Sequence, residues 1–83
     1  MTDSRFLVFT REDCPLCEEF IAELSGLVPE FEVRDVDADP VTRRRYGLKV
    51  PALTCDGSLV CHGRVDREAI ARLAARRDSR HTG

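Results

Sequence analysis

The hydrophobic positions in the first half of the chain change from a continuous run to helical spacing and back. The run Phe6-Leu7-Val8-Phe9 is apolar throughout, as expected of a strand that is covered on both faces. From about Pro15 to Ser25 apolar residues recur at helical spacing, and Gly26 and Pro29 follow as stop signals. Residues 31–36 begin with alternation, which predicts a less buried strand. This half therefore predicts a strand–helix–strand unit with parallel strands.

The second half of the chain predicts a short helix, a hairpin and a last helix. Asp39-Pro40 combines a capping acid with a proline at the first helical position, and Gly47 is expected to end this helix in the left-handed conformation. Asp56-Gly57 lies between two apolar segments and predicts a two-residue hairpin turn. Asp66 is placed to cap the last helix. The expected fold is α/β, in the order β-α-β-α-β-β-α, with a single mixed sheet and helices on both faces.

Length and charge restrict the class of protein. The chain has 83 residues, which predicts one domain over residues 1–76 and a disordered tail over residues 77–83. No apolar run is long enough to span a membrane, and the run near the N-terminus is too short for a signal peptide, so we expect a cytoplasmic protein, and a monomer. Residues 1–40 carry eleven acids and three bases, whereas residues 41–83 carry four acids and ten bases. A nucleic-acid binder would be more one-sidedly basic, so we expect no nucleic-acid partner.

The motif Cys14-Pro15-Leu16-Cys17 carries the candidate chemistry. Pro15 suits the first turn of a helix, which places both thiols near the helix N-terminus. Unpaired N–H groups and a partial positive charge at that end favour a thiolate. Cys14, at the cap, is expected to be exposed and reactive, and Cys17, one turn further, to be more buried. The pair predicts a nucleophile and a resolving cysteine for disulfide exchange.

The other two cysteines lie on the predicted hairpin. A two-residue turn sets Cys55 opposite Ser58 and Ala52 opposite Cys61. Because side chains alternate between the faces of a strand, Cys55 and Cys61 are then expected to point to opposite sides. We therefore expect both cysteines to be reduced strand residues.

Three classes of function are open on the residues alone. The first is a thiol–disulfide oxidoreductase that uses Cys14 and Cys17. The second is a non-catalytic binding or adaptor module in which these cysteines are incidental. The third is a metal-binding domain, since Cys14, Cys17, Cys61 and His62 are of the types that bind zinc. The adjacency of Cys61 and His62 is poor ligand spacing, so no metal site is expected.

The chain resembles the glutaredoxin-like branch of the thioredoxin superfamily, and more narrowly the small bacterial glutaredoxin-like domains. The resemblance covers residues 6 to about 75 and depends on motifs in the family's order. It implies a sheet in the order 2-1-3-4. Typical glutaredoxins have tyrosine where this chain has Leu16. The matching motifs are Cys14-Pro15-Leu16-Cys17, Asp39-Pro40 with Tyr46-Gly47, Val50-Pro51, and Gly63 with Asp66.

The resemblance also implies a peptide-binding site around Val50-Pro51. The Val50–Pro51 bond is expected to be cis, with the proline packed against the sulfur of Cys14. The Val50 backbone is expected to pair with a bound peptide such as glutathione. The expected partners are therefore glutathione, as a thiol co-substrate, or a protein that carries a disulfide, with no bound cofactor.

The remaining residues implied by the resemblance would bind the ligand's carboxylates. The backbone N–H groups of Val65 and Asp66, at the start of the last helix, are expected to bind the γ-glutamyl carboxylate of glutathione. Arg11 is the basic residue that precedes the cysteine motif, and Lys49 is a further source of positive charge.

Overall fold

The computed structural model describes residues 5–73. Its sheet has four strands in the order β2-β1-β3-β4. After β4 the chain is helical again over residues 67–73. The named elements are β1 (Phe6–Thr10), α1 (Pro15–Ser25), β2 (Glu32–Asp35), the 3₁₀ helix η1 (Val36–Ala38), α2 (Pro40–Tyr46), β3 (Ala52–Cys55) and β4 (Ser58–His62).

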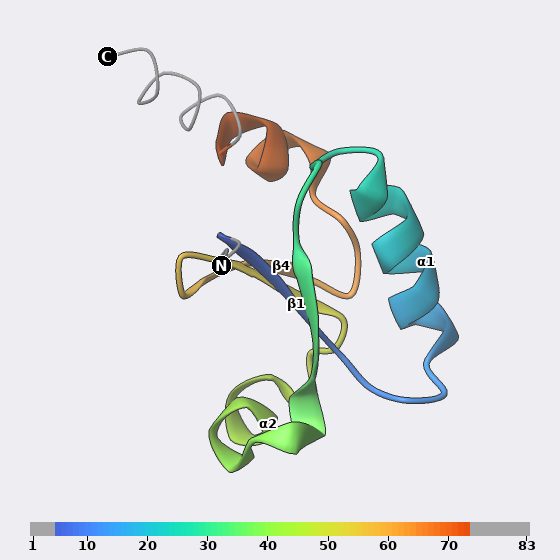
Figure 1. Cartoon of the computed structure of the whole chain (residues 1–83), viewed down its shortest axis with the longest axis vertical. Helices are drawn as coiled ribbons and strands as arrows, with labels where there is room; N and C mark the ends of the chain where they lie inside the picture. Colours follow the sequence, from blue (N-terminus) through green and yellow to red (C-terminus); the bar gives the residue numbers. More distant parts are fainter. Residues whose placement is uncertain (1–4, 74–83) are drawn as a thin grey trace.

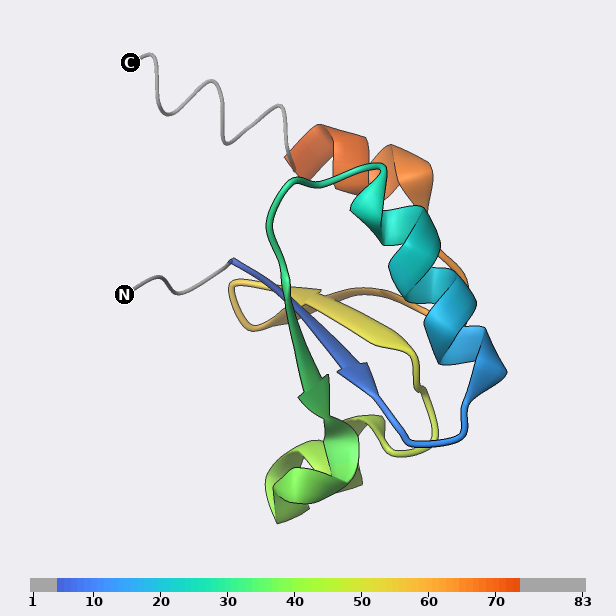
Figure 2. The ribbon, with the colours of Figure 1, turned by 45° about the vertical axis from the view of Figure 1, so that its right-hand side comes forward.

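The pairing of the strands gives the mixed sheet that the sequence predicts. β1 runs parallel to β2 and antiparallel to β3, and β4 is antiparallel to β3 at the edge. In Figures 1 and 2, α1 and the last helix lie over the same side of the sheet, whereas α2 lies at its other end. The predicted order of elements and strands is confirmed. The expected tail, residues 77–83, lies outside the described residues.

Alternation along β1 divides the core between the two faces of the sheet. Phe6 and Val8 face α1 and the last helix, and Phe9 faces α2, with the half-buried Leu7 packed beside it. This is the double coverage expected of the continuous apolar run. The α1-side core contains Phe6, Val8, Phe20, Leu24, Val28, Leu53, Cys55 and Ile70. The smaller α2-side core contains Phe9, Val36 and Ala52, with Leu7, Tyr46 and Val50 packed against it.

The helix starts follow the local signals in the sequence. The Asp39 carboxylate accepts a hydrogen bond from the N–H of Val41 at 2.8 Å and caps α2, as predicted. At the other end of α2, Tyr46 stacks on Phe9 with ring centroids 5.0 Å apart. The short helix η1 has no counterpart in the predicted elements. It is capped by Asp35, whose carboxylate accepts from the N–H of Asp37 at 2.9 Å.

Gly47 corrects the expected end of α2. It does not adopt the left-handed conformation, because its φ of −57° and ψ of −31° are ordinary right-handed helical values. The requirement for glycine is steric instead. A Cβ at this position would collide with the backbone carbonyl oxygen of Arg43.

The hairpin turn is confirmed, but the register beyond it is not. Asp56 and Gly57 both have positive φ, at 52° and 87°, as a type I′ turn requires. An irregularity in the ladder between Leu53 and Thr54 then shifts the pairing, so that Cys61 lies opposite Leu53 rather than opposite Ala52.

This shift overturns the expectation that Cys55 and Cys61 point to opposite sides. One extra residue in β4 moves each later side chain of the strand to the opposite face of the sheet. Cys61 therefore packs, like Cys55, against the α1-side core. Both cysteines are free thiols. Within residues 5–73, no helix is long and apolar enough to cross a lipid bilayer.

Candidate active site

Cys14 is the N-cap of α1. Its backbone is extended, with φ −120° and ψ 95°, and Pro15 follows at the first helical position. The Sγ atom of Cys14 accepts a hydrogen bond from the backbone N–H of Cys17 at 3.2 Å. A sulfur atom here takes the place of the Ser, Thr, Asp or Asn oxygen that normally caps a helix. The local signal that ends β1 and starts α1 therefore also directs an N–H group at the sulfur of Cys14.

The two motif thiols differ in exposure. Cys14 is partly exposed, whereas Cys17 is 3% exposed. Burial, together with a hydrogen bond to Cys14, raises the pKa of Cys17 to about 11, although the backbone of Arg11 opposes the shift. Removal of a thiol from water disfavours its charged form, which explains the direction. The exposed first thiol and the buried second thiol are as the sequence predicts.

The segment that follows α2 brings a proline to the start of β3. The Val50–Pro51 bond is cis, as the family resemblance implies. Pro51 is buried, Val50 is half-buried against the α2-side core, and Lys49 is exposed. The carbonyl oxygen of Pro51 accepts a hydrogen bond from the N–H of Gly63 at 2.8 Å, which joins this segment to the residues after β4.

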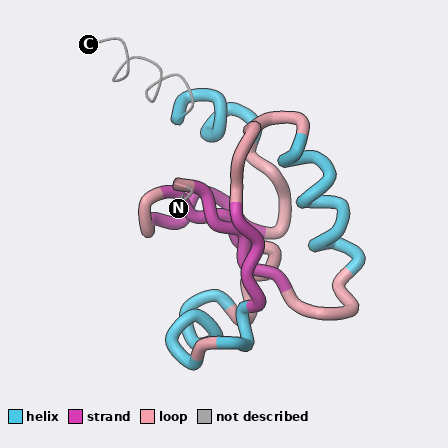
Figure 3. Tube along the Cα trace, in the orientation of Figure 1, coloured by secondary structure: helices cyan, strands magenta, loops and turns pink. Residues whose placement is uncertain are grey.

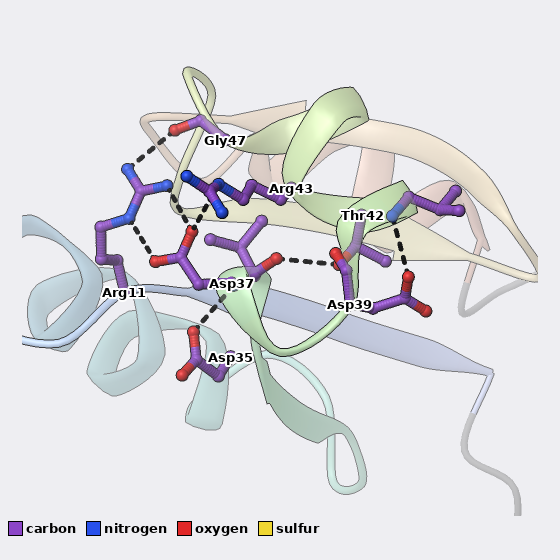
Figure 4. Close-up of polar contacts among 9 residues, drawn as sticks. Arg11, Asp35, Asp37, Asp39, Thr42, Arg43 and Gly47 are labelled. Carbon is purple, nitrogen blue, oxygen red and sulfur yellow. Dashed lines mark hydrogen bonds and ion pairs between the residues drawn. The ribbon is translucent and has the colours of Figure 1, made fainter.

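The Arg11 guanidinium is held by hydrogen bonds within the protein. Its Nε and Nη2 donate to the two carboxylate oxygens of Asp37 at 2.9 and 3.0 Å, and its Nη1 donates to the carbonyl oxygen of Gly47 at 2.9 Å (Figure 4). The guanidinium lowers the pKa of Asp37, and the carboxylate raises that of Arg11 further. Arg43 adds a longer contact to Asp37 at 3.7 Å. Each of the three nitrogen atoms of the Arg11 side chain therefore donates one hydrogen bond within the protein, which uses three of its five N–H groups.

Asp66 caps the last helix, as predicted. Its carboxylate accepts from the N–H of Ala69 at 3.1 Å, and its carbonyl oxygen from the N–H of Ile70 at 3.1 Å. Val65 packs against the α1-side core. Burial raises the pKa of Cys61, and a hydrogen bond from the Asp66 backbone opposes that shift. The Asp66 N–H, which the resemblance assigns to a ligand carboxylate, therefore donates to the sulfur of Cys61.

Exposed acids lie close to the cysteine motif in sequence, and two leucines, one in the motif and one after α2, are also exposed. Leu16 is 48% exposed and Leu48 fully exposed. Four acidic residues close to Cys14 in sequence are exposed and form no ion pair within residues 5–73; they are Glu12, Asp13, Glu18 and Glu19. Sequence reasoning identified the acids but gave no role to Leu48.

Asp37 and Gly47 belong to the site and were not identified from the sequence. Both contact Arg11, across 26 and 36 residues respectively. No local pattern marks such a contact, because it depends on where η1 and the end of α2 lie relative to the end of β1. The residues of the zinc alternative do not assemble, since no group of three or more potential metal-binding side chains is found within residues 5–73.

Solved structures define the class of fold. The chain is similar to the solution NMR structure of protein Ne2328 from Nitrosomonas europaea, with 32% identity, a TM-score of 0.73, and coverage of 88% of this chain and 93% of that one. It is also similar to the X-ray structure of protein XcR50 from X. campestris, with 26% identity, a TM-score of 0.69, and coverage of 84% and 96%. The holo form of glutaredoxin C1 from Populus tremula x tremuloides shares the fold at 14% identity and a TM-score of 0.55, with 88% and 76% covered.

The sheet order, the cysteine pair at the start of α1 and these neighbours define a glutaredoxin-like domain of the thioredoxin superfamily. The chain belongs to the family described as Glutaredoxin-like domain (DUF836), which matches residues 5–74. No curated protein matches the sequence significantly. The family and the fold support a thioredoxin-like redox role. Cys14 and Cys17 lie close together, since the backbone N–H of Cys17 donates to Sγ of Cys14.

Proposed function

We propose that this domain is a thiol–disulfide oxidoreductase in which Cys14 is the nucleophile and Cys17 the resolving thiol. The observation that carries the proposal is the arrangement of the motif: a partly exposed Sγ of Cys14 accepts the Cys17 N–H at 3.2 Å, one turn from a buried second thiol. Donated N–H groups and the helix N-terminus both stabilise a thiolate over a thiol. The sulfur of Cys14 is accessible to a substrate disulfide, and the buried sulfur of Cys17 would react only in the second step.

The reaction consists of two exchanges. The Cys14 thiolate attacks one sulfur of a substrate disulfide, so that a Cys14–substrate disulfide forms, the original S–S bond breaks, and the leaving thiolate takes up a proton. Cys17 then loses its proton and attacks Sγ of Cys14, which releases the second substrate thiol. Two electrons pass from the dithiol to the substrate, and the domain is left with a Cys14–Cys17 disulfide that two further thiol equivalents must reduce, leaving as a disulfide themselves.

The environment of Cys17 favours this order of events. Burial is the first cause of its high pKa, and interactions with Cys14 are among the others. Once Cys14 is in a mixed disulfide it carries no negative charge and competes less for the Cys17 proton. The pKa of Cys17 therefore falls at the stage when its thiolate is required.

We propose glutathione or a disulfide-bearing protein as the partner, with the domain acting as a cytoplasmic monomer and without a bound cofactor. The Val50 backbone would pair with the peptide, and Lys49 together with the N–H groups of Val65 and Asp66 would bind its carboxylates. Arg11 would add its positive charge beside the ligand, with three of its five N–H groups engaged by Asp37 and Gly47.

Two single-cysteine variants test the proposal. With a glutathione mixed disulfide or a small disulfide as substrate, Cys14→Ser should lose activity completely. Cys17→Ser should accumulate a mixed disulfide at Cys14, which intact mass spectrometry detects. Cys55→Ser is the matched control, since it alters a thiol outside the motif, on β3, and should retain activity. Equal activity in Cys14→Ser and wild type would refute the proposal and favour the adaptor alternative.

A further inference from the structure

Arg11 connects two loops that the candidate reaction needs together. It lies in the turn between β1 and α1, three residues before Cys14, and it reaches Gly47 at the start of the segment that leads to Val50-Pro51. Figures 2 and 3 show these two loops side by side at the same end of the sheet. The Arg11 guanidinium donates to the Gly47 carbonyl at 2.9 Å, and Asp37 holds the other edge of the group.

The contacts around this guanidinium depend on its shape as well as on its charge. Three different nitrogen atoms each donate one hydrogen bond, two to a single carboxylate and one to a backbone carbonyl (Figure 4). A lysine ammonium has no planar fork and could not make the bidentate contact and the carbonyl contact together. At Gly47 a Cβ would lie 3.4 Å from Nη2 of Arg11, which is an ordinary contact, whereas it would collide with the Arg43 carbonyl. The steric requirement for glycine therefore comes from the backbone and not from the guanidinium.

We propose that Arg11 is a positioning residue, which fixes the Cys14 loop relative to the Val50-Pro51 segment through Asp37 and the Gly47 carbonyl. This inference rests on the proposed disulfide exchange. A substrate that pairs with the Val50 backbone presents its sulfur to Cys14 only if the distance between the two loops is fixed. The competing explanation is that Arg11 acts on Cys14 through its positive charge alone.

Two reactions of Cys14 separate these explanations. Alkylation by iodoacetamide needs only the ionised sulfur of Cys14, whereas exchange with a peptide disulfide also needs the second loop in place. For Arg11→Met, Arg11→Lys and Asp37→Asn, we expect kcat/KM for the disulfide to fall by about 10- to 100-fold, the effect of misplacing reacting groups by roughly 1 Å. The rate of Cys14 alkylation at a fixed pH should stay close to that of wild type in all of them. A general loss of folded protein would instead open the buried thiols of Cys17 and Cys55 to alkylation, which distinguishes it from a loss of positioning.

The charge explanation predicts a different pattern in the same variants. Arg11→Met would slow the alkylation of Cys14, Arg11→Lys would restore its rate, and Asp37→Asn would speed it by removing the carboxylate that offsets Arg11. Any of these changes in rate without a selective loss of disulfide exchange would overturn the positioning role. Arg11→Lys also retains the side-chain stem and the charge, so it serves if Arg11→Met does not fold.

A second ion pair provides the matched control. Arg67 and Glu23 are joined at 2.9 Å between the last helix and α1, and both are exposed. Arg67→Met and Glu23→Gln should leave both reactions of Cys14 unchanged. If wild type alkylates at Cys14 but exchanges with no disulfide, the proposed function itself fails. If wild type exchanges and the Arg11 and Asp37 variants keep its kcat/KM, only the positioning role fails.

Discussion

In the reduced protein, Cys17 should react with an alkylating agent far more slowly than Cys14. The pKa of Cys17 is raised from 9.0 to about 11, and two units correspond to about 3 kcal/mol in favour of the neutral thiol. At pH 8 about one part in a thousand of Cys17 is then ionised, against about a tenth of a thiol with the unshifted pKa of 9.0. Its 3% exposure restricts the reagent further. We therefore expect a rate at least about a hundredfold below that of a free thiol.

The assay uses a Cys55→Ala, Cys61→Ala background, in which only the motif thiols remain. Iodoacetamide is added to the reduced protein between pH 7 and 11, the reaction is quenched at intervals, and the labelled cysteine is assigned by fragmentation in the mass spectrometer. Cys14 should be labelled first, and Cys17 labelling should rise only as the pH passes about 10. Substitution of Cys14 by serine should shift the pH dependence of Cys17 labelling downward, because interactions with Cys14 contribute to its high pKa. Labelling of Cys17 within tenfold of the Cys14 rate at pH 8 would refute this reasoning.

Three further predictions concern stability and use urea unfolding as the measurement. Gly47→Ala should destabilise the fold by about 1–3 kcal/mol, because the new Cβ meets the Arg43 carbonyl, whereas Gly26→Ala, where the nearest atom is 3.6 Å away, should not be destabilising. Leu53→Ala should cost about 2–5 kcal/mol, and the exposed Leu48→Ala less than about 0.5 kcal/mol; equal costs would contradict the packing. A raised pKa means that the folded state keeps a proton on Cys17 that the unfolded chain releases. The contribution of Cys17 to the free energy of unfolding should therefore be fully present below pH 9.0 and be lost as the pH rises to about 11. In Cys17→Ala the free energy of unfolding should decrease less over this range.

Local signals were sufficient to predict most elements of the fold. The caps at Cys14, Asp39 and Asp66 depend on residues within one helical turn, and the Asp56-Gly57 turn depends on the positive φ that both positions adopt. The apolar run in β1 predicts coverage of both faces, which the two cores provide. These features need no information from distant parts of the chain.

The features that sequence reasoning missed depend on longer-range geometry. Leu59, Val60 and Cys61 are consecutive apolar residues without alternation, so nothing in the sequence of β4 fixed its register, and the bulge was not predicted. Gly47 is required by a neighbouring carbonyl rather than by its own backbone conformation, a difference that composition does not reveal.

The same limit applies to the candidate site. The cysteine pair and its helix start are local, and both could be identified in the sequence. The contacts of Arg11 could not be predicted, because its partners Asp37 and Gly47 are 26 and 36 residues away. A charged residue near a reactive thiol therefore cannot be assigned to a substrate until its other contacts are known.

The most direct test of the central claim is to oxidise the reduced wild-type protein with one equivalent of glutathione disulfide and map the product by peptide mass spectrometry. The account predicts an intramolecular bond between Cys14 and Cys17, with two equivalents of glutathione released and Cys55 and Cys61 still reduced. A stable glutathione adduct at Cys14 that Cys17 does not displace, or a bond that involves neither motif cysteine, would contradict it.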